Sequence, residues 1–265
     1  ELDDGDGLGD DAGAVAGFGS LPTNNAFRAT RWNGTLHNLG SAAGFSQTVA
    51  TAVSESGAVY GVGFVLADPD MHTLRFDDAG VVDLGAFSAK AVNSAGDLVG
   101  LTNFSIAGYL YPRPCIYRSA MVTNLTLLTG GLTGQAMDVN DSGRIVGSSF
   151  TSALTFPRPV LWTSAAAAPI DLGALAGTAT AGGQAMAINA GGSIAGWSRL
   201  ANDYAHATLW RTNTVGAVTQ RIDLGALTPT TTSYANAINS SDVVVGTSDF
   251  RAFVWSAGTM TDLNT

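Results

Sequence analysis

The chain has 265 residues, of which 46% are hydrophobic, so it belongs with globular rather than disordered proteins. Its net charge of -9 and pI near 4.5 disfavour nucleic-acid binding, which needs a basic surface, and disfavour anionic membrane surfaces for the same reason. No apolar run approaches the ~20 residues that cross a bilayer, so membrane insertion is not predicted. Cys115 is the only cysteine, which excludes a disulfide framework and a CxxC metal pair.

The chain begins with an acidic, glycine-rich segment. Residues 3–11 have the sequence D-D-G-D-G-L-G-D-D. Carboxylate oxygens and glycine turns are features of calcium loops, so one interpretation is a calcium site. Its ligands would be Asp4, Asp6, Asp10 and Asp11. The other interpretation is an acidic, partly disordered terminus, because the spacing misses the calcium-loop pattern and no glutamate closes it. No other cofactor is predicted.

An aromatic residue ends a short apolar segment six times, at intervals of 41 to 48 residues. These residues are Trp32, Phe76, Tyr117, Trp162, Trp210 and Trp255. A hairpin signal precedes each of them, such as V-N-S-A-G-D-L-V-G at 92–100, and a short segment ending in Asx-Leu follows. Each unit therefore predicts four short strands.

Small residues recur at fixed places in these units. Asn93 and the glycine three residues later, Gly96, are typical of a tight turn between the first two strands, and equivalent pairs recur in other units. A second glycine follows four residues on, at Gly17, Gly61, Gly100, Gly147, Gly196 and Gly246. Glycine inside a strand indicates close approach of another backbone segment. Alanine recurs in the first strand, where small side chains suit the crowded centre of a propeller.

Four short strands repeated every 40 to 50 residues are typical of a β-propeller. Helical solenoids need a 3.6-residue period that this sequence lacks, and β-helix turns are much shorter. We therefore predict an all-β fold: a closed, six-bladed β-propeller with four antiparallel strands per blade, in a single domain spanning 1–265. The predicted blades are approximately 1–40, 41–85, 86–128, 129–173, 174–225 and 226–265. The first inner strand, at 3–11, fits this pattern least well.

The repeated segments resemble those of the bacterial extracellular HAF-repeat family. The resemblance lies in H-A-T-L-W at 206–210, R-A-F-V-W at 251–255, the A-φ-N-x-x-G-x-V-V-G hairpins and the D-L-G-A-L connections at 171–175 and 223–227. It covers nearly the whole chain, and the first unit matches most poorly. The resemblance implies β-propeller-like repeats and an exported bacterial protein, at the cell surface or secreted. It implies no reaction.

A basic residue lies four positions before each repeated aromatic. The six residues are Arg28, His72, Arg113, Arg158, His206 and Arg251. Each unit also has an Asx before its final leucine, at Asn38, Asp83, Asn124, Asp171, Asp223 and Asp262. One interpretation is a structural hydrogen-bonded pair in each blade. A second is a cationic ring that binds a carboxylate, an acidic sugar or an acidic partner. A third is a mixture, in which some of the six residues are structural and others reach solvent.

The segments before the predicted third strands vary in length and carry aromatic residues. We name Tyr109, Tyr111, Phe156, Tyr204 and Phe250 as candidate ligand contacts. Variable loops on a rigid scaffold are where binding usually occurs, and aromatic rings suit sugars and peptides. The alternative is that these rings fold back and cover blade edges.

No catalytic motif is present: the sequence lacks HExxH, GxSxG and a glycine-rich phosphate loop. The leading hypothesis is a non-enzymatic extracellular binding or scaffold module, with an unknown carbohydrate or protein ligand on its loop face. An alternative is a propeller hydrolase or lyase acting in the axial funnel, for which Asp138 is the one named candidate. A further alternative is a self-associating surface protein.

Overall fold

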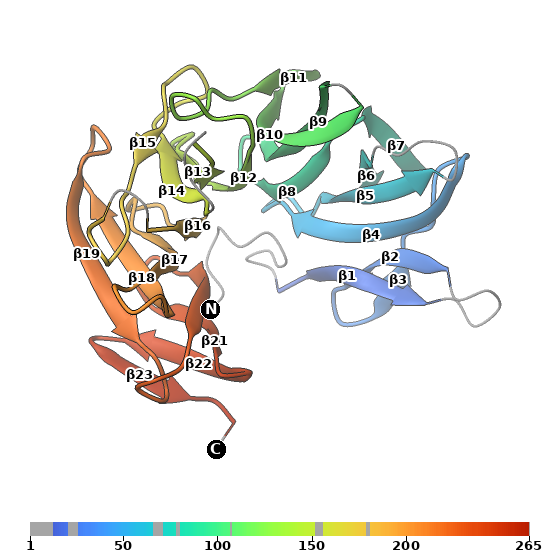
Figure 1. Ribbon diagram of the computed structural model, residues 1–265. Coiled ribbons are helices and arrows are strands. Elements are labelled where there is room, and N and C mark those ends of the chain that lie inside the picture. Colours follow the sequence, from blue (N-terminus) through green and yellow to red (C-terminus); the bar gives the residue numbers. More distant parts are fainter. Residues whose placement is uncertain are drawn as a thin grey trace.

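The computed structural model describes residues 13–20, 26–65, 71–77, 80–106, 108–151, 156–178 and 181–264. Within these residues the regular elements are β-strands, and they form six antiparallel sheets that follow one another in chain order. The sheets are arranged around a central space (Figure 1). The predicted all-β, six-bladed propeller is therefore confirmed. No helix of the described residues is long and apolar enough to span a membrane.

The strands of the first three sheets occupy the N-terminal half of the chain. The first sheet has β1 (Val15–Ser20), β2 (Phe27–Trp32) and β3 (Leu36–Asn38). The second has β4 (Phe45–Val53), β5 (Val59–Val65), β6 (His72–Asp77) and β7 (Gly80–Gly85). The third has β8 (Ser88–Val92), β9 (Leu98–Ile106), β10 (Tyr109–Arg118) and β11 (Met121–Asn124).

The remaining three sheets repeat the same order. The fourth has β12 (Gly134–Val139), β13 (Ile145–Ser149), β14 (Arg158–Trp162) and β15 (Ile170–Asp171). The fifth has β16 (Gly183–Ile188), β17 (Ile194–Arg199), β18 (Ala205–Thr212) and β19 (Val218–Gly225). The sixth has β20 (Ser233–Ile238), β21 (Val244–Ser248), β22 (Arg251–Ser256) and β23 (Thr259–Asp262).

In the five four-stranded sheets the first strand lies at the inner edge and the fourth at the outer edge (Figure 1). The first sheet has three strands among the described residues. Its β1 carries Gly17 and so corresponds to the second strand of the other sheets. The inner strand predicted for this blade, at 3–11, lies outside the described residues.

A β-bulge interrupts the inner strand of each four-stranded sheet. In the fourth sheet the register with β13 shifts between Ala136 and Asp138. The bulge carries the carbonyl of Gln135 over Gly147, where a Cβ atom would lie 2.0 Å from that oxygen. Bulges at the same place in the other four sheets do the same to their glycines. The predicted close backbone approach at the second glycine is confirmed there.

The turn asparagines connect successive blades. Asn93 closes its own turn, because its Oδ1 accepts a hydrogen bond from the N–H of Asp97 at 2.9 Å. Its Nδ2 donates to the carbonyl of Asn140 in the next blade, at 3.3 Å. Asn140 donates likewise to Asn189, and Asn189 to Asn239, at 3.0 and 2.9 Å. The sixth turn has Asp242 in place of glycine, at φ 58°, in the left-handed region that aspartate tolerates better than most residues.

Each of the five junctions between neighbouring sheets holds its own apolar cluster. The repeated aromatic of a blade packs toward the preceding blade. Trp162 and Trp210 are fully buried, and their Nε1 atoms donate to the carbonyls of Thr126 and Gly173 in the preceding blade, at 2.8 and 2.9 Å. Burial of apolar side chains at these junctions, the large aromatics among them, stabilises the contact between blades.

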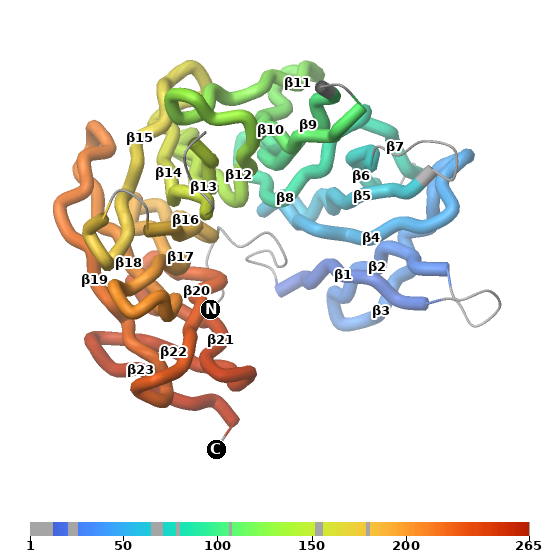
Figure 2. Tube along the Cα trace, viewed as in Figure 1, coloured from blue at the N-terminus to red at the C-terminus, as the bar shows by residue number. Residues whose placement is uncertain are grey.

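The first and sixth sheets lie at the two ends of an arc rather than side by side (Figures 1 and 2). Among the described strands, β1 and β2 pack on β4 of the second sheet, whereas no extensive packing joins them to the sixth. The prediction of a closed ring therefore fails for the described residues. The segment 3–11, where the sequence fits the repeat least well, lies outside the described residues.

Candidate functional site

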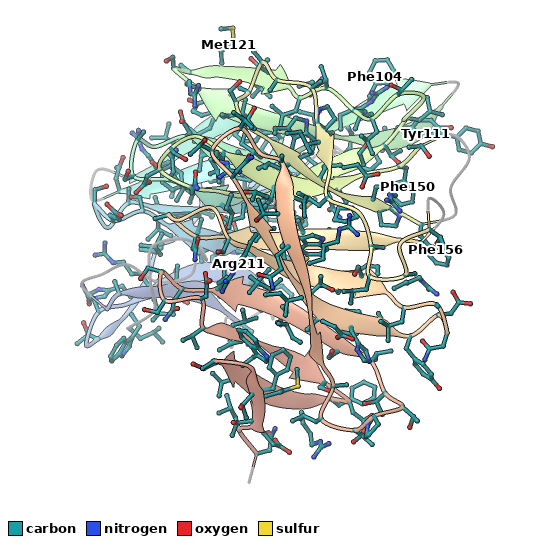
Figure 3. The ribbon with its side chains drawn as sticks, turned by 90° about the vertical axis from the view of Figure 1, so that its left-hand side faces the viewer. Phe104, Tyr111, Met121, Phe150, Phe156 and Arg211 are labelled. Carbon is teal, nitrogen blue, oxygen red and sulfur yellow. The ribbon has the colours of Figure 1, made fainter. Side chains whose placement is uncertain are left out.

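Five of the six repeated basic residues lie at the start of the strand that carries the repeated aromatic, and Arg113 is the fifth residue of the longer strand β10. His72, Arg158 and Arg251 open β6, β14 and β22, whereas Arg28 and His206 are the second residues of β2 and β18. The starts of these strands mark one face of the molecule, which we call the loop face. Phe104, Tyr111, Phe150 and Phe156 gather on one side, at the right of the view in Figure 3.

Four of these residues, two histidines and two arginines, are bonded to the aspartate of their own blade. The pairs are His72 Nδ1–Asp83 Oδ2 at 2.9 Å, Arg158 Nε–Asp171 Oδ2 at 2.9 Å, His206 Nδ1–Asp223 Oδ1 at 2.8 Å and Arg251 Nη1–Asp262 Oδ2 at 2.7 Å. These bonds join the third strand to the fourth. In these four blades the structure has the cation–acid pair that the sequence suggests.

Arg158 shows how far such a pair is built into the fold. Its side chain is buried, and its guanidinium forms two hydrogen bonds with the carboxylate of Asp171. Its Nη1 also donates to the carbonyls of Thr178 and Ala181, in the connection to the next blade. Asp171 in turn accepts the N–H of Gly173 at 2.8 Å. Arg158 is therefore committed to internal contacts.

The first and third blades have asparagine in place of aspartate, and their cations behave differently. Arg28 donates from Nη1 to the carbonyl of Ser46, at 2.8 Å, and so joins the first blade to the second. Asn38 accepts the N–H of Gly40 at 2.9 Å. A neutral amide does not hold the arginine, which finds backbone carbonyl partners instead.

Arg113 is the exception among the six. Its guanidinium carbon lies 5.4 Å from the ring centroid of Phe104, a cation–π contact. Asn124, at the aspartate position of this blade, accepts a hydrogen bond from Thr102 Oγ1 at 2.8 Å. Within the part of the chain that the structure describes, the Arg113 guanidinium has no hydrogen-bonding or ion-pair partner. It is half-buried beside an exposed aromatic ring.

The surroundings of Arg113 are part of a long hairpin. Residues 103–106 and 109–112, in a segment expected to be a loop, instead continue the paired strands β9 and β10, with Tyr109 opposite Ile106 and Pro112 opposite Asn103. Tyr109 is exposed and Tyr111 is half-buried. The β-propensity of the aromatic residues explains why pairing extends through this region. The hairpin therefore raises its aromatic residues above the body of the third blade.

Sequence reasoning missed Phe104 and Leu110, which are also exposed on this hairpin. The signal that could have identified them is the run N-F-S-I-A-G-Y-L-Y at 103–111, with alternating apolar residues on either side of a glycine turn. The regular pairing places Phe104, Tyr109 and Tyr111 on the same face of the hairpin as Arg113 and places Leu110 on the other face.

The other predicted aromatic contacts differ in exposure. Phe156 lies under the guanidinium of Arg199, whose carbon is 3.8 Å from the ring centroid. Tyr204 is exposed. Phe250 is fully exposed at the turn between β21 and β22, with φ 63°, a conformation that a bulky side chain rarely adopts. Phe156 therefore serves as a platform for an arginine, whereas Tyr204 and Phe250 are presented to solvent.

Asp138, the axial carboxylate considered for catalysis, is buried within the fold. Its Oδ1 accepts the N–H of Val139 and its Oδ2 accepts the N–H of Ile188, both at 2.7 Å. It therefore joins β12 to β16 in the next blade. The calcium ligands proposed at Asp4, Asp6, Asp10 and Asp11 lie outside the described residues, and no group of three or more potential metal ligands occurs within them.

Two electrostatic features lie away from the loop face. Asp97, in the turn region before β9, receives two hydrogen bonds from Arg118, at 2.7 and 2.6 Å. These bonds lower the pKa of Asp97, and Asn93 adds to the effect against the opposing influence of burial. Burial raises the pKa of the Cys115 thiol to about 12, so this cysteine is unreactive at neutral pH.

Comparison with known proteins identifies the fold and goes no further. No family model and no curated protein match the chain. The β-propeller domain of the Trilobed protease from Pyrococcus furiosus has a TM-score of 0.64 and 10% identity, over 94% of this chain and 80% of that one. TolB from Acinetobacter baumannii has a TM-score of 0.54 and 14% identity, over 94% of this chain and 62% of that one.

The Aleuria aurantia lectin is a third solved structure with a similar fold. Its TM-score is 0.50 and its identity 11%, over 98% of this chain and 94% of the lectin. At identities this low the likeness shows the β-propeller fold alone. The resemblance to the HAF-repeat family therefore stays a prediction.

Proposed function

We propose that this chain is a non-enzymatic binding module that holds an anionic ligand on its loop face, beside the β9–β10 hairpin. The observation that carries the proposal is Arg113. In four blades the equivalent arginine or histidine is bonded to an aspartate, whereas the blade of Arg113 has an asparagine at that position and, within the described residues, the guanidinium contacts the ring of Phe104 without an acid partner. A half-buried guanidinium without an acid partner is suited to a carboxylate from outside the chain.

The ligand class that fits best is a carbohydrate bearing a carboxylate. Arginine would bind the acidic group, and Phe104 and Tyr109 would pack against the sugar ring. The net charge of -9 repels densely charged polyanions, which favours a ligand with isolated carboxylates among hydroxyl groups. The Aleuria lectin was solved in complex with Fucalpha1-6GlcNAc, so a protein of this fold can hold a sugar. Export from a bacterial cell, as in the HAF-repeat family, would place the module where such glycans occur.

Catalysis in the axial funnel has less support than binding. Both carboxylate oxygens of Asp138 accept backbone hydrogen bonds, and the side chain is buried. An acid or base in that position would have to break bonds that join two blades. The unpaired cation lies on the loop face instead, which favours recognition there.

The test is a binding screen followed by a matched pair of variants. The chain is applied to an array of neutral and uronic-acid oligosaccharides, and the best uronic-acid probe is then titrated by calorimetry. Arg113→Gln should weaken that binding at least about tenfold, because it removes a charge-assisted hydrogen bond. Arg75→Gln is the control, since Arg75 is equally cationic but already bonded to Asp77 at 3.1 Å.

Unchanged binding by Arg113→Gln, or an equal loss in both variants, would contradict the proposal. Circular dichroism of both variants separates a binding defect from unfolding. Because Arg113 makes no hydrogen bond to the described part of the chain, Arg113→Gln should keep the wild-type melting temperature.

A further inference from the structure

The turn between β2 and β3 carries the only Asn-Gly pair in the sequence, at Asn33 and Gly34. Both residues are exposed, and so are Thr35 and the whole of β3. The pairing of Trp32 with Leu36 closes the turn, and the N–H of Asn33 donates to the carbonyl of Thr35 at 3.2 Å. The turn therefore exposes to water both an asparagine side chain and the peptide nitrogen that follows it.

The peptide nitrogen of Gly34 is free to react. Gly34 has φ 98°, and a Cβ atom at this position would meet nothing within 4 Å, so the surrounding chain does not shield this backbone. Among the residues that the structure describes, none accepts a hydrogen bond from the Gly34 N–H. A peptide nitrogen that follows asparagine can attack the side-chain amide carbon, and glycine hinders this attack least because it has no Cβ.

The side-chain oxygen of Asn33 lies beside two further polar side chains. His37 Nε2 is 3.1 Å from Asn33 Oδ1, and Thr35 Oγ1 is 3.5 Å from the same oxygen. His37 is held there by its pairing with Arg31 across β2 and β3. An imidazole with a hydrogen on Nε2 donates to Oδ1, whether the ring is neutral or protonated. A donor is therefore placed at the atom where negative charge develops when the amide carbon is attacked.

We propose that Asn33 is a site of intramolecular deamidation and that His37 assists the reaction. The Gly34 nitrogen loses its proton to a base in solution and attacks Asn33 Cγ, which forms an N–Cγ bond and places negative charge on Oδ1. The Nε2–H of His37 stabilises this oxyanion. The Cγ–Nδ2 bond then breaks, Nδ2 takes up a proton from solution and leaves as ammonia, and a succinimide ring remains. Water opens the ring at either carbonyl and leaves aspartate or isoaspartate at position 33, so water is consumed and ammonia is released.

The reaction changes the charge at the edge of the first sheet. A neutral amide becomes a carboxylate beside His37, which gives a histidine–carboxylate contact like that between His72 and Asp83 in the second blade. The isoaspartate product also adds a methylene group to the backbone of the turn. The modification therefore alters both the electrostatics and the covalent geometry of this turn.

Asn93 provides a comparison within the same chain. It is also followed by a small residue, Ser94, but its side chain is buried and both of its amide atoms form hydrogen bonds. The N–H of Ser94 donates to Asp141 Oδ1 at 2.8 Å, so the nitrogen that would attack is also engaged. The fold therefore protects Asn93 at both of the groups that are free to react at Asn33 and Gly34.

Peptide mapping by mass spectrometry tests the site. The folded chain is incubated at mildly alkaline pH, samples are digested at intervals, and conversion of each asparagine is measured. Asn33 should convert to aspartate and isoaspartate over days while Asn93 remains an amide. Asn33→Gln should remain an amide over the same period, because its longer side chain would have to close a larger ring. Persistence of the Asn33 amide, or equal conversion of Asn33 and Asn93, would overturn the proposal.

His37→Thr tests the assistance. Threonine keeps a strand-forming side chain in β3 but is too short to reach Asn33 Oδ1, so conversion of Asn33 should be at least about threefold slower. Leu36→Thr is the matched control, because it changes the neighbouring exposed residue of β3 and should leave the rate unchanged. In concentrated urea the wild type and His37→Thr should convert equally, since the hairpin that brings His37 to Asn33 is lost. Equal rates in the folded proteins, equal slowing by Leu36→Thr, or a difference that persists in urea would overturn the assistance by His37.

Discussion

At the scale of single residues, the position before the final leucine of each blade decides which partner the repeated basic residue has. Aspartate there bonds to the basic residue, and asparagine does not. Aspartate at positions 83, 171, 223 and 262 bonds to the arginine or histidine of its blade. Asn124 does not hold Arg113. The repeat pattern in the sequence identifies both positions, and the residue type at the second position distinguishes the blades. A carboxylate accepts a charge-assisted bond that a neutral amide cannot match, so the distinction was available from the residue types alone.

Arg158→Gln should destabilise the protein. The guanidinium is buried and bonds to Asp171 and to two backbone carbonyls, so its loss leaves acceptors without partners. We expect the free energy of unfolding to fall by about 1–3 kcal/mol. Urea denaturation measures it, and Arg113→Gln serves as the comparison. Equal stability of the two variants would contradict the assignment of a structural role to Arg158 and a binding role to Arg113.

Asp97 should make stability depend on pH on the acid side. Its folded-state pKa is lowered by Arg118, so its contribution is complete above the ordinary pKa of 3.8 and is lost as pH falls through the lowered value. Asp97→Asn should therefore be less stable than wild type at pH 7, with a smaller difference at pH 2.5. Thermal melting across this range measures the effect. A constant difference between the two proteins would show that Asp97 is not the titrating group.

At the scale of the element, the bulged inner strand explains a glycine that composition alone leaves unexplained. The sequence indicated close backbone approach, and the structure identifies the approaching group as a carbonyl oxygen 1.9 to 2.1 Å from where a Cβ would lie. The bulge itself could not be predicted, because the segment A-M-D-V-N has the same residue types as an unbulged strand. Register shifts arise from pairing with a partner strand, which a single repeat does not show.

Gly147→Ala should be severely destabilising, whereas Gly17→Ala should be tolerated. The first substitution places a methyl group against the Gln135 carbonyl, while the nearest atom to the second is Thr30 Oγ1 at 3.9 Å. We expect a loss of about 3 kcal/mol or more for Gly147→Ala and less than about 1 kcal/mol for Gly17→Ala. Chemical denaturation of the pair measures the difference. Similar losses would mean that an inner strand also covers Gly17.

At the scale of the whole molecule, the repeat period predicts the six sheets and their strand order. Departures from the repeat determine the features that differ between blades. Six units and their strand order follow from the spacing of the aromatics and glycines. The spacing does not predict the open ends of the arc, because the exposed Trp32 belongs to the same sequence pattern as the buried Trp162 and Trp210. Burial of a repeated residue depends on the neighbouring blade, which lies far away in sequence.

The same reasoning applies to the loop face. The six cations form a symmetrical set in the sequence, but in the fold they make at least three different kinds of contact. The third blade departs from the set through Asn124 and through its long aromatic hairpin. Function is therefore expected where the repeat is broken rather than where it is regular.

Asn124→Asp tests this account most directly, because it restores the acid that the other blades have. The new carboxylate should pair with Arg113, as Asp171 pairs with Arg158, and neutralise the ligand-binding cation without removing it. Calorimetric titration with the uronic-acid oligosaccharide should show binding weakened at least about tenfold, with the melting temperature equal to or above that of wild type. Binding of wild-type strength by Asn124→Asp would contradict the account.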